Sequence, residues 1–323
     1  MPTPATAKTA VHIVTYNHAH LIDACLRPLR DLDVTVCIVD NGSTDDTVRR
    51  VEQAGYACIV NATNLGYSGA HNQALRQTQS EYVLTLNPDV VLQPGYIETM
   101  CAVLDANPDV GSAAGCLLRV NALDETPQVI DSVGLFMRRN RRQGLLLDGE
   151  PLDRRPTTQQ IILGPDGAAA FYRRAMLDDI AIDGEIFDED FFIHKEDVDL
   201  CWRALLRGWK SLYVPDAVAW HIRNFRPGKR ETVDPFLRLC AVRNRYLLML
   251  KNEDPALFRR DLLPIIAYDA AIIGYLLLRE RSSLRALGSA WALRHKMSAK
   301  RRQIQSRRRA TTEQIAPFMG HRS

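Results

Sequence analysis

Residues 82–92 read YVLTLNPDVVL, an unbroken apolar run that stops at Asn87-Pro88-Asp89 and then resumes. Three similar apolar runs lie upstream, at residues 11–14, 34–39 and 57–60. Segments with helical spacing separate them, at residues 19–30, 44–54 and 69–79. Alternation of apolar strands with helices is typical of a parallel sheet that helices cover on both faces. The sequence therefore predicts an α/β fold, in which ligands bind beyond the carboxyl ends of the strands.

The loop after the first strand is Thr15-Tyr16-Asn17-His18, and it disfavours two common kinds of nucleotide site. It has neither the G-x-G-x-x-G of dinucleotide-binding folds nor the G-x-x-x-x-G-K-[ST] of a P-loop. An aromatic ring beside small polar groups is suited to flanking a nucleobase. A polar entry into the next helix explains the same residues equally well, so this loop alone leaves both interpretations open.

The second loop runs from Asp40 to Asp46. Ser43 and Asp46 fit the S-x-x-D pattern that caps the N-terminus of a helix. Asp40 has no capping role, because it ends the preceding apolar strand. A carboxylate at that position is suited to accept hydrogen bonds from the ribose or base of a nucleotide, and a purely structural role is the alternative. In the third loop, Gly66 and Gly69 permit close approach of a ligand.

Asp89 belongs to the fourth loop and is flanked by apolar segments on both sides. An unpaired carboxylate is costly in such surroundings. A divalent cation with phosphate oxygens would satisfy it, because Mg²⁺ sites commonly use one or two carboxylates plus substrate phosphates. An Asx-type turn opened by Asn87-Pro88 is the structural alternative.

Acidic residues cluster at the start of a helix that is predicted over residues 198–207. The helix dipole and an i,i+4 pair account for Asp199 and Arg203. Glu196 and Asp197 exceed what helix capping needs. A carboxylate at such a position is suited to act as a general base.

Residues 121–160 are rich in Arg, Asp, Pro and Gly, which predicts a long loop or small excursion of the kind that often carries function. A pair of strands is expected farther on, at residues 211–214 and 218–220. His221 ends the second of them. A lone histidine is usually structural, and this one gains a functional role only if it meets Asp89 in space.

Taken together and in this order, several segments resemble the family 2 glycosyltransferases of the GT-A fold. The matching segments are IVTYN, IVDNGSTDDT, NLGYSGAHNQAL, YVLTLNPDVVL, GPDGAAAFYRR, FDEDFFIHKEDVDLCWRALLRGW and VPDAVAWH, within residues 10–225. The chain looks closest to the rhamnosyltransferase-like branch that builds bacterial surface polysaccharides, on softer features such as residues 131–134. The resemblance implies a Rossmann-like nucleotide-binding sheet flanked by helices, followed by a helical C-terminal extension.

The resemblance also implies which residues bind the nucleotide-sugar donor and its metal ion. The donor-binding set is Thr15, Tyr16, Asn17, Asp40, Asn64, Gly66, Asn72 and Asn87. The D-x-D metal motif of the family aligns with Asn87-Pro88-Asp89, so its first carboxylate is replaced by Asn87 and Asp89 becomes the expected ligand of Mg²⁺ or Mn²⁺. His221 matches a position that reaches the metal in some relatives.

The remaining motifs imply the residues of the transfer step. The E-D motif of the family falls on Glu196-Asp197, with Asp197 as the expected base. Gly167 and Ala168 lie in the segment that corresponds to the acceptor region. In this mechanism the base takes the proton of an acceptor hydroxyl while its oxygen attacks the anomeric carbon, and one displacement inverts the stereochemistry.

The function that the resemblance implies is an inverting, metal-dependent glycosyltransferase. It would move a sugar, with rhamnose favoured, from a nucleoside diphosphate to a hydroxyl of a lipid-linked or polysaccharide acceptor. A sugar-nucleotide nucleotidyltransferase is one alternative, but it should carry a Gly-rich phosphate loop after the first strand. A non-catalytic nucleotide-sugar-binding protein is another. The incomplete metal motif allows it, whereas the intact Glu196-Asp197 pair argues against it.

The net charge of +3 conceals an uneven distribution. Residues 279–309 hold eleven of the 41 basic residues and one of the 38 acidic residues, so this segment carries +10 and the rest of the chain −7. The apolar segment 262–278 precedes it and is shorter than the ~20 residues of a spanning helix. A buried core helix or an interfacial segment is favoured. The basic run fits an anionic membrane surface, while a solvated helix or disordered tail is the alternative.

We therefore expect a GT-A catalytic domain over residues 1–225 and a helical, basic, membrane-associating region over residues 226–323. Within the first, a nucleotide-sugar half ends near residue 120 and an acceptor half follows. No nucleic-acid-binding motif accompanies the basic run. The oligomeric state stays open, including a homo-oligomer. Seven scattered cysteines and no apparent signal peptide predict a cytoplasmic protein, peripheral at the inner face of the cell membrane.

Overall fold

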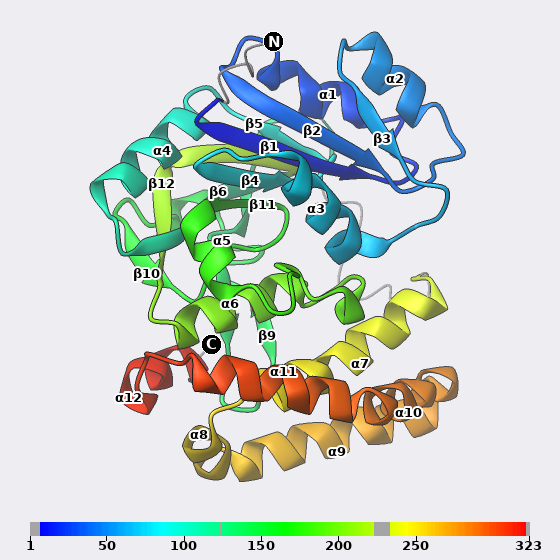
Figure 1. Ribbon diagram of the computed structural model, residues 1–323, viewed down its shortest axis with the longest axis vertical. Coiled ribbons are helices and arrows are strands. Elements are labelled where there is room, and N and C mark those ends of the chain that lie inside the picture. Colours follow the sequence, from blue (N-terminus) through cyan, green and yellow to red (C-terminus); the bar gives the residue numbers. More distant parts are fainter. Residues whose placement is uncertain (1–6, 123–124, 223–232, 321–323) are drawn as a thin grey trace.

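The computed structural model describes residues 7–122, 125–222 and 233–320. Figure 1 shows a twisted central sheet with helices on both faces and a layer of helices from the C-terminal part of the chain along one end. The strands are β1 (Thr9–Thr15), β2 (Val34–Asp40), β3 (Cys58–Val60), β4 (Tyr82–Leu86), β5 (Val90–Leu92), β6 (Val110–Val120), β7 (Val129–Ser132), β8 (Leu135–Met137), β9 (Gln143–Leu145), β10 (Gln160–Ile162), β11 (Ala169–Arg173) and β12 (Lys210–Ile222).

The helices divide between the two parts of the chain. Those of the first part are α1 (Ile22–Leu26), α2 (Thr47–Gln53), α3 (Gly66–Gln77), α4 (Tyr96–Ala106), α5 (Arg174–Ile180) and α6 (Glu196–Leu206), with short 3₁₀ turns that include η3 (Glu189–Phe191). Those of the second part are α7 (Pro235–Asn252), α8 (Pro255–Arg260), α9 (Leu262–Arg279), α10 (Arg285–Ala292), α11 (Arg294–Ser306) and α12 (Thr312–Ile315).

The four apolar runs of the sequence are β1 to β4, and they pair in parallel as predicted. The order across the main path of the sheet is β10-β12-β6-β11-β4-β1-β2-β3. β4 is central and buried at all five of its residues, which explains its unbroken apolar sequence. The register sets Thr15 opposite Asp40, so the first two predicted loops leave the sheet side by side. The α/β fold class is confirmed.

The predicted strand pair near the end of the first part is wrong in one respect. Residues 210–222 form the single strand β12, which pairs in parallel with β6 and crosses an irregularity where the register shifts between Tyr213 and Val218. Pro215 lies within that irregularity, which is where a strand tolerates a residue without an N–H donor. The 121–160 excursion contains short strands, including the hairpin β8–β9.

Helices cover both faces of the sheet and bury separate apolar layers. Side chains of α1 and α4 pack with the sheet in one cluster, and those of α3, α5 and α6 pack with β4 and β11 in another. A third cluster joins the two parts of the chain. In it, Trp202 of α6 packs with Leu247 of α7 and Met297 of α11. The predicted boundary between residues 225 and 226 lies outside the described residues.

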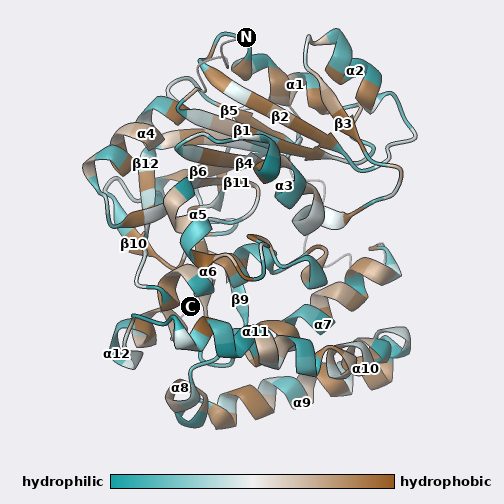
Figure 2. Cartoon of the chain, in the orientation of Figure 1, coloured by the Kyte–Doolittle hydropathy of each residue, from teal (hydrophilic) through white to brown (hydrophobic). Residues whose placement is uncertain are grey.

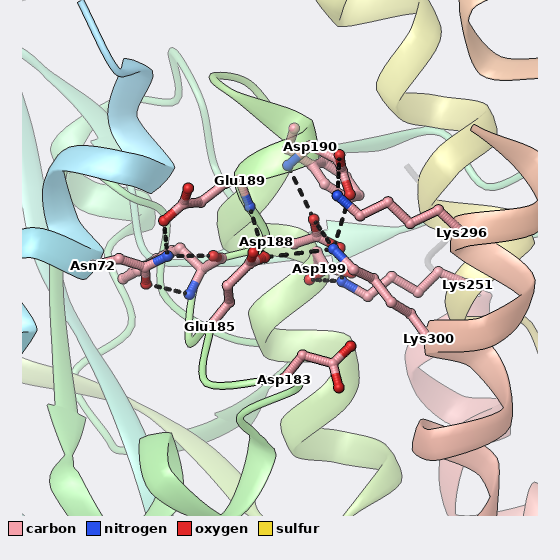
Figure 3. Close-up of polar contacts among 12 residues, drawn as sticks. Asn72, Asp183, Glu185, Asp188, Glu189, Asp190, Asp199, Lys251, Lys296 and Lys300 are labelled. Atoms are coloured by element: carbon pink, nitrogen blue, oxygen red, sulfur yellow. Dashed lines mark hydrogen bonds and ion pairs between the residues drawn. The ribbon is translucent and has the colours of Figure 1, made fainter. Parts of the chain in front are cut away.

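The basic C-terminal helices pair with acids of the first part in a lysine–aspartate cluster, formed by Asp188, Asp190, Asp199, Lys251, Lys296 and Lys300 (Figure 3). Lys251 Nζ lies 2.6 Å from a carboxylate oxygen of Asp188 and 2.8 Å from one of Asp199, and all three side chains are buried. Lys300 Nζ contacts Asp188 at 2.6 Å and Asp190 at 2.8 Å. Although burial opposes ionisation, the charges of the two lysines hold the pKa of Asp188 well below its ordinary value.

The apolar segment 262–278 forms α9, and it is not the buried core helix that the sequence allowed. Only Ile265 and Leu276 of its residues are buried. Leu263 is 80% exposed and Leu278 81% exposed. Figure 2 colours much of α9 as hydrophobic at the outer edge of the molecule. By length and composition it is the one helix among the described residues that meets the criteria for crossing a membrane, which is weak evidence by itself.

Candidate active site

A cavity of about 540 Å³ opens at the carboxyl ends of the parallel strands, and we call it the donor cavity. Six residues that the sequence singled out for donor or metal binding line it: Thr15, Tyr16, Asn64, Gly66, Asn87 and Asp89. A cavity therefore lies at the edge where the sequence predicts a ligand site, and the binding of a ligand in it stays a prediction. Asn41, Phe192 and Leu237 also line the cavity and were not expected from the sequence.

Asp40 and Asn17 shape this edge of the sheet rather than line the cavity. The carboxylate of Asp40 is fully buried and accepts hydrogen bonds from the hydroxyls of Thr15 and Ser43 and from the backbone N–H groups of Gly42 and Ser43. These four donors fill its acceptor sites. Asn17 accepts from the N–H of Thr44 at 2.8 Å, which locks the first two loops together. The expected helix cap is wrong, because Ser43 bonds to these loops instead.

Asn72 also lies outside the donor cavity lining. Its side-chain nitrogen donates to the carbonyl of Phe187 at 2.7 Å and to Glu189 at 3.0 Å, and its oxygen accepts from the N–H of Phe187 at 2.9 Å. Figure 3 shows these contacts bridging α3 and the loop before α6. This side chain therefore holds the two elements together, and a direct role in donor binding is left as a prediction without a contact to support it.

Asp89 and His221 meet in space, which was the condition set for a functional role of the histidine. Nε2 of His221 lies 3.4 Å from a carboxylate oxygen of Asp89, and Nδ1 lies 2.7 Å from a carboxylate oxygen of Asp131. A carboxylate can only accept, so Nδ1 carries the hydrogen toward Asp131. Burial disfavours the imidazolium, but the two carboxylates outweigh it and raise the pKa of His221 to about 10.

These residues fit a divalent cation once His221 gives up its Nε2 proton, because a histidine binds a metal only in its neutral form. The Asp89 oxygen that faces His221 is buried and makes no hydrogen bond among the described residues. A histidine ligand commonly binds through one nitrogen while its other N–H donates to a carboxylate, as His221 does to Asp131. Over the described part of the chain no group of three or more His, Cys, Asp or Glu side chains is arranged to hold a metal. The phosphates of a donor would therefore have to complete the coordination.

Asp197 lies at the start of α6 and lines a second cavity of about 300 Å³. One of its oxygens accepts from the N–H of Gly167 at 3.1 Å and the other from the N–H of Val198 at 2.7 Å. Burial and the nearby charge of Asp166 raise the pKa of Asp197. A carboxylate with a raised pKa beside a cavity is suited to accept a proton. Glu196 is more deeply buried, and burial with the adjacent Asp197 raises its pKa to about 8.

Gly167 and Ala168 connect Asp197 with the loop that carries Asp89. The N–H of Gly167 donates to Asp197, and the carbonyl of Ala168 accepts from the N–H of Asn87 at 2.8 Å. Tyr67 donates its hydroxyl to the carbonyl of Gly167 at 2.9 Å. The segment predicted to lie near the acceptor thus lies between the Asn87–Asp89 loop and the start of α6.

The loop between η3 and α6 is strained. Phe192, His194 and Lys195 have φ values of 64°, 71° and 71°, a region that L-residues rarely occupy. Gly66 approaches it so closely that a Cβ there would collide with the backbone oxygen and ring of Phe192. Residues 192–195, which we call the strained loop, line the donor cavity with Phe192 and Ile193 and the cavity of Asp197 with His194 and Lys195.

Asn244 of α7 holds the strained loop. Its side chain is fully buried, and its amide nitrogen donates to the carbonyls of Phe191, Ile193 and His194 at 2.9, 2.9 and 2.7 Å. Sequence analysis missed this residue, as it missed Asp131 and Lys251, because their partners are distant in the sequence. A polar residue within an otherwise helical segment was the only available signal.

Comparison with known proteins gives a consistent result. Residues 10–181 match the family described as "Glycosyl transferase family 2". The N-acetylglucosaminyl-diphospho-decaprenol L-rhamnosyltransferase of Mycobacterium tuberculosis is 27% identical over 299 residues, covering 84% of this chain and 92% of that protein. The chondroitin synthase of Escherichia coli is 33% identical over 97 residues, which cover 28% of this chain and 14% of that protein.

Solved structures share the fold. The mannosyltransferase PcManGT from Pyrobaculum calidifontis, in complex with GDP-Man and Mn²⁺, superposes with a TM-score of 0.54 at 17% identity, covering 94% of this chain and 86% of that one. Residues 1–349 of TarS from S. aureus, in complex with UDP-GlcNAc, give 0.56 at 19% identity, covering 92% and 89%. The GT-A fold is confirmed by these likenesses.

Replacement of Asn244 tests whether the strained loop positions the transfer machinery. Asn244→Leu keeps the size of the side chain and removes the Asn244 donor from the carbonyls of Ile193 and His194, each at a cost of about 1–3 kcal/mol if it stays buried. The carbonyl of Phe191 keeps two other donors, Arg243 and the N–H of Ile193. We expect a lower unfolding midpoint and, at temperatures where the variant is folded, a fall in kcat on the order of tenfold or more with little change in donor KM.

Asn107→Leu is the matched control, because it removes one amide hydrogen bond, to Val103, at the far end of α4. It should keep the kcat of the unmodified chain. A folded Asn244→Leu variant with normal kcat would show that Asn244 serves stability alone.

Proposed function

We propose that this chain, which belongs to glycosyl transferase family 2, transfers a sugar from a nucleoside-diphosphate donor to an acceptor hydroxyl with inversion at the anomeric carbon. The observation that carries the proposal is the adjacency of two cavities. The donor cavity contains Asp89, the neighbouring cavity contains Asp197, and Leu237 lines both. A donor in the first and an acceptor in the second would therefore face each other across a short distance.

The donor cavity has the groups that such a substrate needs. Tyr16 is 46% exposed and offers an aromatic face to a nucleobase. Asn64 is exposed in the same cavity and offers a polar side chain to a nucleoside. Asn41 is buried and holds the third loop, because its amide bonds to Gly66 and Leu65. Asp89 and His221 would hold Mg²⁺ or Mn²⁺, which supplies positive charge that stabilises the departing nucleoside diphosphate. PcManGT and GalNAc-T7, which share the fold, were both solved with Mn²⁺.

Asp197 is the proposed base. Its carboxylate borders the cavity on the acceptor side, and the hydrogen bond from Gly167 keeps it oriented. Its raised pKa strengthens it as a proton acceptor, provided that it is ionised at the working pH. Glu196 lies on the buried side of α6, where burial and the adjacent Asp197 raise its pKa to about 8, so near neutral pH it adds little negative charge to the site.

The donor sugar that we favour is rhamnose, and the acceptor class is a lipid-linked or polysaccharide hydroxyl. The support is the 27% identity to a mycobacterial rhamnosyltransferase whose name specifies a diphospho-decaprenol acceptor. We propose a cytoplasmic location at the inner face of the membrane for the same reason. A thermal-shift screen of sugar nucleotides with Mn²⁺ identifies the donor, because stabilisation follows RT ln(1 + [L]/Kd).

We propose that α9, more than the basic residues of 279–309, contacts the membrane. Several basic side chains of residues 279–309 contact the chain itself. Lys296 and Lys300 join the lysine–aspartate cluster, and Arg308 pairs with Asp254 at 2.6 Å. The exposed apolar side chains of α9, with Trp291 of α10 at 68% exposure, remain available to an interface.

The base assignment predicts a clean separation of binding from turnover. Asp197→Asn should lower transfer by about a thousandfold or more while donor affinity changes less than twofold, because general-base catalysis contributes 10²–10⁴-fold. Asp216→Asn, an exposed position on β12, is the matched control and should be unaffected. Release of nucleoside diphosphate and calorimetric donor binding are the two measurements. Near-normal turnover by Asp197→Asn would refute the assignment.

The metal assignment predicts a metal-linked loss of donor affinity. Asp89→Ala should weaken donor binding at least about tenfold, roughly 1.4 kcal/mol, in the presence of Mn²⁺. Without divalent metal, the variant and the unmodified chain should bind the donor equally weakly. Titration calorimetry with and without Mn²⁺ makes the comparison. Equal affinities in the presence of metal would exclude Asp89 as a ligand.

The membrane proposal predicts a site-specific loss of vesicle binding. Leu263→Glu combined with Leu278→Glu should weaken co-sedimentation with phosphatidylglycerol-containing vesicles on the order of tenfold or more, because burial of each leucine contributes about 1.5–3 kcal/mol. Val60→Glu combined with Ile161→Glu is the control, since each is 57% exposed on the sheet region. Equal loss in both double variants, or none in either, would contradict the role of α9.

A further inference from the structure

The donor cavity continues into a cleft that leads to α9. The second cavity, which contains Asp197, shares Leu237 with the donor cavity. A third cavity of about 420 Å³ shares Gln143, Lys195 and Ala241 with the second. We call the second and third cavities together the acceptor cleft. Because neighbouring cavities share lining residues, the three follow one another in order: the donor cavity, the cavity of Asp197, and the cavity lined by α9.

The second cavity contains two hydrogen-bond donors without an acceptor among the described residues, and one of them, on Gln143, lies on the wall that the second and third cavities share. Nε of Arg238 and Nε2 of Gln143 are buried and make no hydrogen bond within the described ranges. Among the described residues, Arg238 forms one ion pair, with Glu280 at 3.8 Å. Such buried donors cost free energy unless a ligand accepts from them.

The charge of this region favours an anion. Lys195 and His194 line the second cavity together with Arg238. Among the described residues of that lining, Asp197 is the only carboxylate. Phosphate oxygens accept several hydrogen bonds and carry negative charge, so a phosphate satisfies the donors of Arg238 and Gln143 and is attracted by the guanidinium of Arg238.

The far end of the acceptor cleft is apolar and opens beside the exposed helix. Its walls include Val242 of α7 and the α9 residues Ile272, Tyr275 and Leu276. Arg245 also lines it, but its guanidinium already donates to Asp269, Asn140 and Arg141. The remaining surface is suited to a hydrocarbon chain.

We infer that the acceptor cleft binds an amphiphile in which phosphate groups join a sugar to a prenyl-type chain. The sugar hydroxyl lies at Asp197, the phosphates lie at Arg238 and Gln143, and the start of the chain lies between α7 and α9. The order of base, unpaired donors and apolar wall along one cleft matches the order of groups in such a molecule. The inference rests on the proposed function for the role of Asp197 and adds the residues that select the acceptor.

The test measures binding of farnesyl diphosphate and of inorganic diphosphate to the full chain by calorimetry, with divalent metal removed so that the donor cavity contributes little. Farnesyl diphosphate should bind at least about tenfold tighter, since 1.4 kcal/mol corresponds to burial of roughly 55 Å² of apolar surface. Equal affinities would overturn the inference.

Variants locate the two ends of the ligand. Ile272→Asn should bring the affinity for farnesyl diphosphate to that for inorganic diphosphate, whereas Arg238→Gln should weaken both ligands in the same proportion. Ile273→Asn and Arg285→Gln are matched controls, because Ile273 adjoins Ile272 outside the cleft lining and Arg285 is exposed on α10. Equal losses in a variant and its control would overturn the assignment.

Folding is checked by the unfolding midpoint. Ile272 is partly buried, so Tyr275→Ala supplies a second change in the same wall at a position that is 45% exposed. It should also reduce the preference for farnesyl diphosphate. A chain that hydrolyses a nucleotide sugar but shows no such preference would refute the cleft assignment and keep the proposed function. If the variants of the cleft behave as expected but Asp197→Asn is fully active, the cleft assignment stands and the proposed role of Asp197 is refuted.

Discussion

The strained loop is the constraint on which the rest of the structure depends. Phe192, His194 and Lys195 have positive φ, and each such residue costs on the order of 1–3 kcal/mol. The loop therefore keeps this conformation only because its surroundings impose it. Asn244 satisfies the loop from α7, the lysine–aspartate cluster fixes the segment before it, and Asn72 ties that segment to α3. Asn244 and Lys251 belong to α7 and Lys300 to α11, whereas Asn72 belongs to α3. The donor cavity and the acceptor cleft meet at this loop, so the helical region is part of the site and not a detachable anchor.

The ion pairs of the C-terminal helices also account for part of the uneven charge distribution of the chain. From the sequence, a body of −7 and a segment of +10 suggested attraction to an anionic membrane. In the structure much of that attraction is internal, because Lys296, Lys300 and Arg308 pair with acids of the chain. Buried ion pairs contribute little net stability after desolvation, but an unmatched partner is costly. We infer that the lysine–aspartate cluster mainly fixes how the C-terminal helices pack on the first part of the chain. The exposed apolar surface of α9 is then the feature that best explains membrane contact.

The sequence predicted what depends on local pattern. The apolar runs gave β1 to β4, their parallel pairing, and the edge where Thr15, Asn87 and Asp89 gather. It did not predict the single strand β12, since Pro215 is a strong local signal that the pairing with β6 overrides. It also missed Asn244 and Lys251, because nothing local distinguishes a helix-surface polar residue from one that reaches a buried carbonyl. Positive φ at Phe192 or Lys195 has no sequence signature at all.

The departure from the D-x-D motif has a structural counterpart. Asn87 removes one carboxylate from the loop, yet Asp131 of β7 supplies another, reaching the site through His221 rather than directly. A carboxylate that accepts from the distal N–H of a histidine raises the basicity of its free nitrogen. On the proposed function, His221 would therefore be a stronger nitrogen ligand for the cation, which would compensate for the carboxylate that position 87 lacks. A site built in this way needs β7, β12 and the Asn87–Asp89 loop in register. The pairing of β12 with β5 provides that register, because it sets His221 opposite Val90, directly after Asp89.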